Sequence, residues 1–115
     1  MRRGDIYVAD LDPARPGEAD KRRPVLVVSN DGANQAVELH ARGVVTVVPL
    51  TSSVQRVLPF QVLLKRKDTG LRADSKAQVE QVRALAHARL GRRVGQVPPG
   101  LMAEVDDALR LHLGL

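Results

Sequence analysis

The chain has 115 residues, 43% of them hydrophobic, and carries 18 Lys and Arg against 13 Asp and Glu, a formal net charge of +5. This length predicts one domain with a modest core, and no apolar run is long enough to span a membrane. The absence of cysteine excludes disulfides, thiolate nucleophiles and cysteine-based zinc sites. The positive charge favours a polyanionic partner, above all nucleic acid, while a single Tyr and a single Phe argue against a base-stacking platform.

Two strands are predicted near the N-terminus, where no secretory signal is expected. Residues 5–11, DIYVADL, are rich in side chains that fit a pleated surface. The polar residues 12–22 predict a loop long enough to be mobile or functional. A second strand is predicted at residues 23–28, RPVLVV, because Pro24 suits the first position of a strand and the apolar run indicates burial on both faces. Arg23 is thereby held on a stiff element at the point where that element leaves the core.

The middle of the chain alternates apolar runs with polar connections. Residues 31–42 are polar and irregular, with room for a turn of helix. Residues 43–50, GVVTVVPL, predict a buried third strand, and the polar loop after it begins with Thr51 and Ser52. Residues 59–64 predict a fourth strand, followed by a charged hairpin connection at residues 65–72.

The last third contains one ambiguous segment. Residues 74–90 fit both an alanine-rich helix and an alternating strand, and the local pattern leaves both open. Residues 91–97 predict a short edge strand protected by its charges. A packing helix is expected from Pro99, with Leu101, Val105, Ala108, Leu109 and His112 on one face.

The titratable residues form no metal or cofactor motif. His40, His87 and His112 are far apart in sequence, and the glycines form no phosphate-binding pattern. Arg23 offers a planar guanidinium that matches phosphate oxygens, and the Thr51 hydroxyl can orient one of those oxygens. Guanidinium is a poor base, so this pair alone does not establish a nuclease.

Blocks spread over essentially the whole chain resemble the MazF/PemK family of toxin endoribonucleases. The blocks are RGDIY (3–7) with ADLDP (9–13), Gly17-Glu18 with RPVLVVSND (23–31), VPLTS (48–52), PF (59–60) with VLL (62–64), and DS (74–75) with EQVR (80–83). The resemblance implies one mainly β (α+β) domain over residues 1–115. Its twisted antiparallel sheet would form a partial barrel of the MazF/CcdB kind with a C-terminal helix. It also implies that residues 74–83 are mostly strand, that a short helix lies near residues 87–90, and that the protein is a homodimer.

The implied activity is metal-independent, cofactor-free cleavage of single-stranded messenger RNA at a short sequence. The products would be a 2′,3′-cyclic phosphate and a 5′-hydroxyl, and the effect would be arrest of translation and growth. The family's catalytic pair maps onto Arg23 and Thr51. Further contacts with RNA are expected from Glu18, Lys21, Asn30, Ser52 and Gln81. The loop around Gly17-Glu18 departs from the Gly-Ser-Glu common among relatives, which leaves the cleaved sequence open.

The expected partner is a cognate MazE-like antitoxin whose acidic segment would cover the basic groove. Any contact with operator DNA would be made through that antitoxin, in the cytoplasm and away from membranes. One alternative is a CcdB-like toxin acting on DNA gyrase. Its activity depends on a C-terminal Trp-Gly-Ile, whereas this sequence ends Leu113-Gly114-Leu115 and has no tryptophan. An inactive RNA- or operator-binding module is the other alternative.

Overall fold

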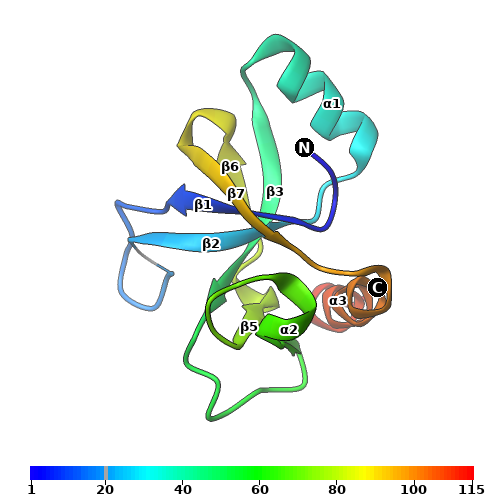
Figure 1. The fold of residues 1–115 in the computed structure, drawn as a ribbon. Helices are drawn as coiled ribbons and strands as arrows, with labels where there is room; N and C mark the ends of the chain where they lie inside the picture. Colours follow the sequence, from blue (N-terminus) through cyan, green and yellow to red (C-terminus); the bar gives the residue numbers. More distant parts are fainter. Residues whose placement is uncertain (20) are drawn as a thin grey trace.

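A seven-stranded antiparallel sheet forms the centre of the computed structural model, which describes residues 1–19 and 21–115 (Figure 1). Asp20, inside the predicted loop, lies outside the described residues. The strands are β1 (Asp5–Asp10), β2 (Arg22–Val27), β3 (Val44–Thr51), β4 (Gln61–Leu64), β5 (Ser75–Gln78), β6 (Arg83–Ala86) and β7 (Leu90–Gln96). The helices are α1 (Asp31–His40), α2 (Arg66–Thr69) and α3 (Pro99–Leu113), and the 3₁₀ turns are η1 (Val79–Gln81) and η2 (His87–Arg89).

The long strand β3 organises the sheet by changing its partners along its length. The strand order is β4-β5-β3-β2-β1-β7, and β6 pairs with β3 as well. The start of β3 pairs with β6, its middle with β2, and its last residues, Leu50 and Thr51, with β5. The sheet therefore twists strongly but does not close. Together with α3 it confirms the predicted fold class, a partial antiparallel barrel with a C-terminal helix.

The hydrophobic core lies on both faces of β2 and β3, as their unbroken apolar runs predict. Leu26 and Val48 pack with the buried face of α3, whereas Val25 and Val47 pack on the other side of the sheet with β6. All four side chains are fully buried. Alternation along a strand sends neighbouring residues to opposite faces, so this pattern requires cover on both sides.

Helix α3 begins at Pro99 as predicted, but its buried face includes Met102, which the predicted face does not. Met102, Val105 and Ala108 are buried there, while Leu101 and Leu109 are half-buried at the edge of the same contact. His112, predicted on the packing face of this helix, is exposed in the single chain. Its ring lies 6.5 Å from that of Phe60.

The prediction of an irregular segment at residues 31–42 is wrong, because α1 is a helix of ten residues. The Asn30 side chain caps it by accepting a hydrogen bond from the Ala33 amide at 2.8 Å. Asn34 is its one fully buried side chain and bonds to Ser29, through both the carbonyl and the hydroxyl of that residue. A helix anchored by a polar side chain lacks the apolar periodicity by which helices are recognised in sequences.

The ambiguous segment at residues 74–90 is two short strands, β5 and β6, each followed by a 3₁₀ turn. This confirms the mostly extended structure and the short helix implied by the family resemblance. Strand β7 lies at the edge of the sheet, as predicted, and the hairpin connection at residues 65–72 contains α2. Within residues 1–19 and 21–115, no helix has both the length and the apolar character needed to cross a membrane.

Candidate active site

Strands β2 and β3 separate at one end of their ladder, and the site lies where they part. Their last pair is Val25 opposite Pro49, a residue with no N–H to extend the ladder. Beyond it, β2 stays paired with β1, whereas β3 pairs with β5. Continuing the β2–β3 register by two residues places Arg23 opposite Thr51. Arg23 and Thr51 both line the opening that forms where the two strands part.

A cleft of about 660 Å³ occupies this opening. Its apolar floor consists of buried and half-buried side chains, namely Val8, Pro24, Leu50, Leu71 and Val94. Its cationic rim consists of exposed side chains, namely Lys21, Arg22, Arg72, Arg92 and Arg93. Arg23, Thr51, Ser52 and Ser75 add polar groups between floor and rim. The cleft thus combines apolar surface suited to a nucleobase with positive charge suited to phosphates.

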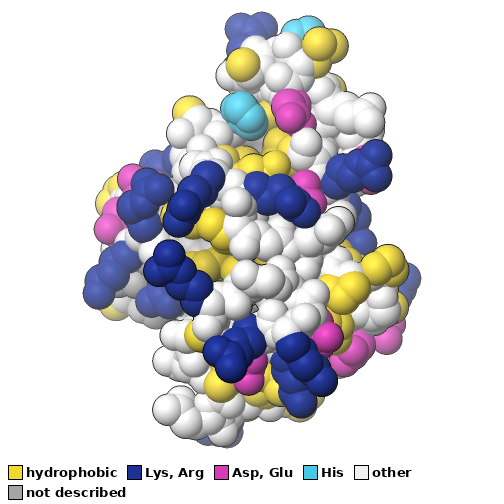
Figure 2. Space-filling view, viewed as in Figure 1, with side chains coloured by type: hydrophobic (Ala, Val, Ile, Leu, Met, Phe, Trp, Pro, Cys, Tyr) yellow, Lys and Arg dark blue, Asp and Glu magenta, His cyan; other side chains and the backbone are white. Residues whose placement is uncertain are grey.

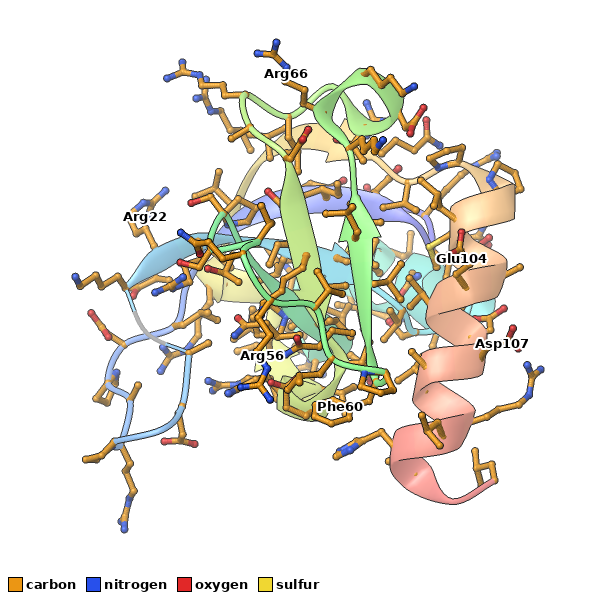
Figure 3. The ribbon with its side chains drawn as sticks, turned by 90° about the horizontal axis from the view of Figure 1, so that it is seen from below. Arg22, Arg56, Phe60, Arg66, Glu104 and Asp107 are labelled. Atoms are coloured by element: carbon orange, nitrogen blue, oxygen red, sulfur yellow. The ribbon has the colours of Figure 1, made fainter. Side chains whose placement is uncertain are left out.

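Charge is distributed unevenly between this face and the C-terminal helix. Figure 2 shows Lys and Arg side chains gathered around hydrophobic surface on the face over β1, β2 and β7. In Figure 3, Arg22 projects from the start of β2, while Glu104 and Asp107 lie on α3 at the opposite side of the molecule. Among the described residues, no carboxylate lines the cleft. A polyanion is therefore attracted to the cleft and not to α3.

An ionic neighbour holds Arg93, which lines the cleft, and burial fixes the charge state of Tyr7, which packs against the core beside β6. Arg93 forms an ion pair with Asp5, with Nε 3.3 Å from Oδ1. Tyr7 lies opposite Arg93 in the β1–β7 ladder. Burial, assisted by the charges of Asp5 and Glu38, raises the pKa of Tyr7 above its ordinary value. Its phenol therefore stays protonated at neutral pH and does not act as a base.

The structure brings four of the predicted site residues to this cleft: Lys21, Arg23, Thr51 and Ser52. Arg23 and Thr51 are half-buried. Arg23 lies on β2, as predicted, whereas Thr51, predicted to begin the loop after the third strand, is the last residue of β3. The Thr51 Oγ1 atom accepts a hydrogen bond from the Ser53 amide at 3.2 Å, which fixes the hydroxyl at the start of the β3–β4 loop. Lys21 has a positive φ of 63° and lines the cleft where β2 begins.

The other three predicted residues, Glu18, Asn30 and Gln81, do not line the cleft. Asn30 caps α1 and follows the far end of β2, roughly 20 Å of extended chain from Arg23. Glu18 is exposed and accepts a hydrogen bond from the Arg15 amide at 2.7 Å, within the loop between β1 and β2. Gln81 bonds to that loop through both ends of its side-chain amide.

Sequence reasoning missed the wall of the cleft opposite β2. Arg72, Leu71 and Ser75 come from the α2–β5 segment, and Arg92 comes from β7. The sequence predicts only edge protection from the arginines of residues 91–97. Their place in the cleft depends on β7 pairing with β1, and no local pattern specifies that pairing.

Close backbone packing fixes that opposite wall. A Cβ atom on Gly95 would lie 2.6 Å from the carbonyl oxygen of Thr69 and 3.3 Å from the Leu71 side chain. Thr69 is itself buried, and its hydroxyl accepts a hydrogen bond from the Leu71 amide at 3.2 Å. Only glycine lets β7 and the end of α2 approach this closely. Gly95 therefore sets how closely the end of α2, which leads to Leu71 and Arg72, approaches β7.

This fold and this site define the class of MazF-type endoribonuclease toxins. The family model of the PemK-like, MazF-like toxins of type II toxin–antitoxin systems matches residues 2–113, and the chain belongs to that family. The resemblance seen in the sequence is thereby confirmed.

Particular relatives support the same assignment. The chain is 54% identical to endoribonuclease MazF9 of Mycobacterium tuberculosis over 115 residues, which are 100% of this chain and 98% of that protein. It is 28% identical to a mycobacterial endoribonuclease solved with its cognate antitoxin, with a TM-score of 0.79, covering 100% of this chain and 96% of that one. For MazF from Deinococcus radiodurans the values are 25% identity, a TM-score of 0.82, and 100% and 97% coverage.

Proposed function

We propose that residues 1–115 form one toxin domain that cuts single-stranded RNA at a short sequence without a metal ion, arresting translation. The observation that carries the proposal is that Arg23 and Thr51 line one cleft with a cationic rim. Divalent cations that assist phosphoryl chemistry prefer carboxylate ligands, and no carboxylate of the described residues lines this cleft. Positive charge at the scissile phosphate is therefore assigned to arginine.

The proposed reaction is an internal transesterification. The ribose 2′-oxygen attacks the phosphorus and passes its proton to water, the bond from phosphorus to the 5′-oxygen breaks, and that oxygen takes up a proton from Arg23, which solvent then reprotonates. The products are a 2′,3′-cyclic phosphate and a 5′-hydroxyl. Arg23 serves in proton transfer and stabilises the charge of the phosphorane, and Thr51 positions the phosphate. No histidine of the described residues lines the cleft to share this work.

RNA recognition is proposed to divide between the floor and the rim of the cleft. An unstacked base would lie against the aliphatic floor, which takes the place of aromatic side chains, while the rim would hold phosphates. Ser52 and Lys21 are proposed to contact RNA directly. Glu18 is proposed to frame the entrance from the β1–β2 loop. Asn30 has no support from its position, since its side chain caps α1.

The experiment is to incubate the purified chain with long single-stranded RNA in excess EDTA and to sequence the cleaved 5′ ends. Discrete cuts that leave 5′-hydroxyl termini are expected. Cleavage only after Mg²⁺ is added would contradict the mechanism. Uncut RNA together with trapped topoisomerase would favour the gyrase-directed alternative, and bound but uncut RNA would favour an inactive binding module.

We further propose a cytoplasmic homodimer neutralised by a cognate antitoxin. The cationic cleft suits an extended acidic segment, and a mycobacterial relative was solved with its cognate antitoxin.

Leu111, Leu113 and Leu115 are exposed at the end of α3, where a second copy would cover apolar surface. Sedimentation of the purified chain tests the dimer. Loss of RNA cleavage on adding an acidic antitoxin peptide tests the competition, and operator DNA should bind only when antitoxin is present.

A further inference from the structure

The loop between β1 and β2 (residues 11–21, here the β1–β2 loop) is attached to the two 3₁₀ turns that flank β6. Gln81 ends η1, and its Oε1 accepts a hydrogen bond from the Ala19 amide at 3.0 Å. Its Nε2 donates to the Gly17 carbonyl at 3.0 Å. Both ends of one side-chain amide therefore hold the peptides on either side of Glu18.

A second attachment holds the base of the same loop. Arg89 ends η2, and its Nη1 donates to the carbonyl oxygens of Asp10 at 3.2 Å and Asp12 at 2.5 Å. The Asp12 side chain in turn accepts from the Lys21 amide at 2.9 Å. The Leu11 amide donates to the Lys21 carbonyl at 2.9 Å, so the two ends of the loop are joined beside the cleft.

The parts that make these attachments are themselves fixed in the core. Val79, in the same turn as Gln81, is fully buried, and Glu80 accepts two hydrogen bonds from the buried Gln61 amide at 3.0 and 3.2 Å. Leu85 of β6, between the two turns, is 1% exposed. Leu11 at the start of the loop is fully buried, but the tip has no comparable burial, since Arg15, Pro16, Gly17 and Glu18 are all exposed. Order at the tip therefore depends on hydrogen bonds from a rigid frame.

We propose that Gln81 and Arg89 are positioning residues that order the β1–β2 loop before RNA arrives, and that neither contacts RNA itself. Arg89 sets Lys21 at the mouth of the cleft, and Gln81 fixes the backbone on either side of Glu18. The inference deepens the proposed function and rests on it for its kinetic consequence. It also replaces the expectation that Gln81 reads RNA, because both hydrogen-bonding ends of its amide are used within the protein.

The structural half is tested without RNA on the full chain. In Gln81→Ala, the Ala19 amide should exchange with deuterium about tenfold faster, the order expected when a hydrogen bond of ordinary net strength is lost. Cutting by a glutamate-specific protease after Glu18 should accelerate in parallel. Gln81→Glu keeps the acceptor for Ala19 and should restore most of the protection of that amide. Gln35→Ala, an exposed glutamine on α1, is the matched control and should change neither rate.

The functional half is tested by cleavage of a short RNA that carries the recognised sequence. If RNA must order the loop as it binds, Gln81→Ala should raise KM by up to about tenfold and leave kcat within about twofold. Arg89→Ala should act in the same direction, with faster exchange at Leu11 in place of Ala19. Gln81→Glu should bring the KM part of the way back to the wild-type value, because it restores most of the protection of the Ala19 amide from exchange.

Two results would overturn the proposal. Weaker cleavage by Gln81→Ala with unchanged exchange at Ala19 would mean that Gln81 contacts RNA directly. Faster exchange with an unchanged KM would mean that order in the loop has no bearing on RNA binding. A wild-type chain that cuts no RNA would count against the proposed function alone, because exchange and proteolysis report on the attachment independently.

Discussion

Arg23 and Thr51 occupy opposed positions two residues beyond the last pair of the β2–β3 ladder, and both line the cleft that opens there. The register of the sheet therefore brings together two residues far apart in the sequence. The same strands that bury Val25 and Val47 in the core hold the two polar side chains at its edge. Each residue is held by pairing with another strand, Arg23 opposite Ala9 of β1 and Thr51 opposite Lys76 of β5, and not by a flexible loop.

Removal of either side chain should abolish cleavage without unfolding the protein. Arg23→Ala and Arg23→Lys should each lower kcat by about 10²–10⁴-fold, because lysine cannot present a planar fork to the phosphate. Thr51→Val should lower it by about 10²-fold, whereas Thr51→Ser, which keeps the hydroxyl, should retain most activity. Single-turnover cleavage of the recognised RNA measures the loss.

The matched control is Arg42→Ala, which removes a cation from an exposed position between α1 and β3. It should cleave at the wild-type rate. Circular dichroism and sedimentation should show all variants folded and in one oligomeric state. A rate for Arg23→Ala within a few-fold of wild type would show that the catalytic residue lies elsewhere.

RNA binding should weaken with salt in proportion to the phosphates that the rim holds. Each phosphate contact contributes about 0.7 to the slope of log affinity against log salt for a single strand. Arg72→Ala should lower that slope by about this amount while leaving the cleaved sequence unchanged. Binding to a substrate with a 2′-deoxy group at the cut, which cannot react, measures the affinity, and Arg42→Ala again serves as control. An unchanged slope for Arg72→Ala would exclude that side chain from the RNA path.

How much of this site can be predicted from the sequence depends on how far apart along the chain the interacting residues lie. The strands that carry Arg23 and Thr51 follow from apolar runs bounded by proline, a local signal. Arg72 and Arg92 reach the cleft only through the pairing of distant segments, which no local pattern encodes. Helix α1 was missed for a different reason, because its anchor is the buried amide of Asn34 where an apolar stripe is expected. The available local signal for this helix is Asn30 at its N-cap, a residue that the family resemblance assigns to RNA.

Alkaline conditions should reveal the effect of partial burial on the pKa of Tyr7. Its pKa in the folded protein is raised above the ordinary value of 10.0, so the native state holds its proton more tightly than the unfolded chain does. The corresponding stability is complete below about pH 10 and is lost as the pH rises through the folded pKa. Urea unfolding at pH 8 and pH 11 should show a smaller loss of stability for Tyr7→Phe than for wild type. Equal losses in the two proteins would mean that Tyr7 does not contribute.

Packing between β7 and α2 should make Gly95 intolerant of even a methyl group. In Gly95→Ala the new Cβ meets the Thr69 carbonyl oxygen, which is backbone and cannot rotate away. Relief requires α2 to move, at a cost of about 1–3 kcal/mol in the free energy of unfolding. The shift also displaces Arg72, so the affinity for RNA should fall together with stability.

Gly100→Ala is the matched control for that substitution. Gly100 lies in the first turn of α3, and a Cβ atom there would meet nothing within 4 Å. Alanine is the better helix former, so this variant should be unchanged or more stable, by up to about 1 kcal/mol. Urea denaturation of both variants, with binding of the uncleavable RNA, separates the two cases. A Gly95→Ala protein with wild-type stability would mean that α2 yields without cost and does not fix the wall of the cleft.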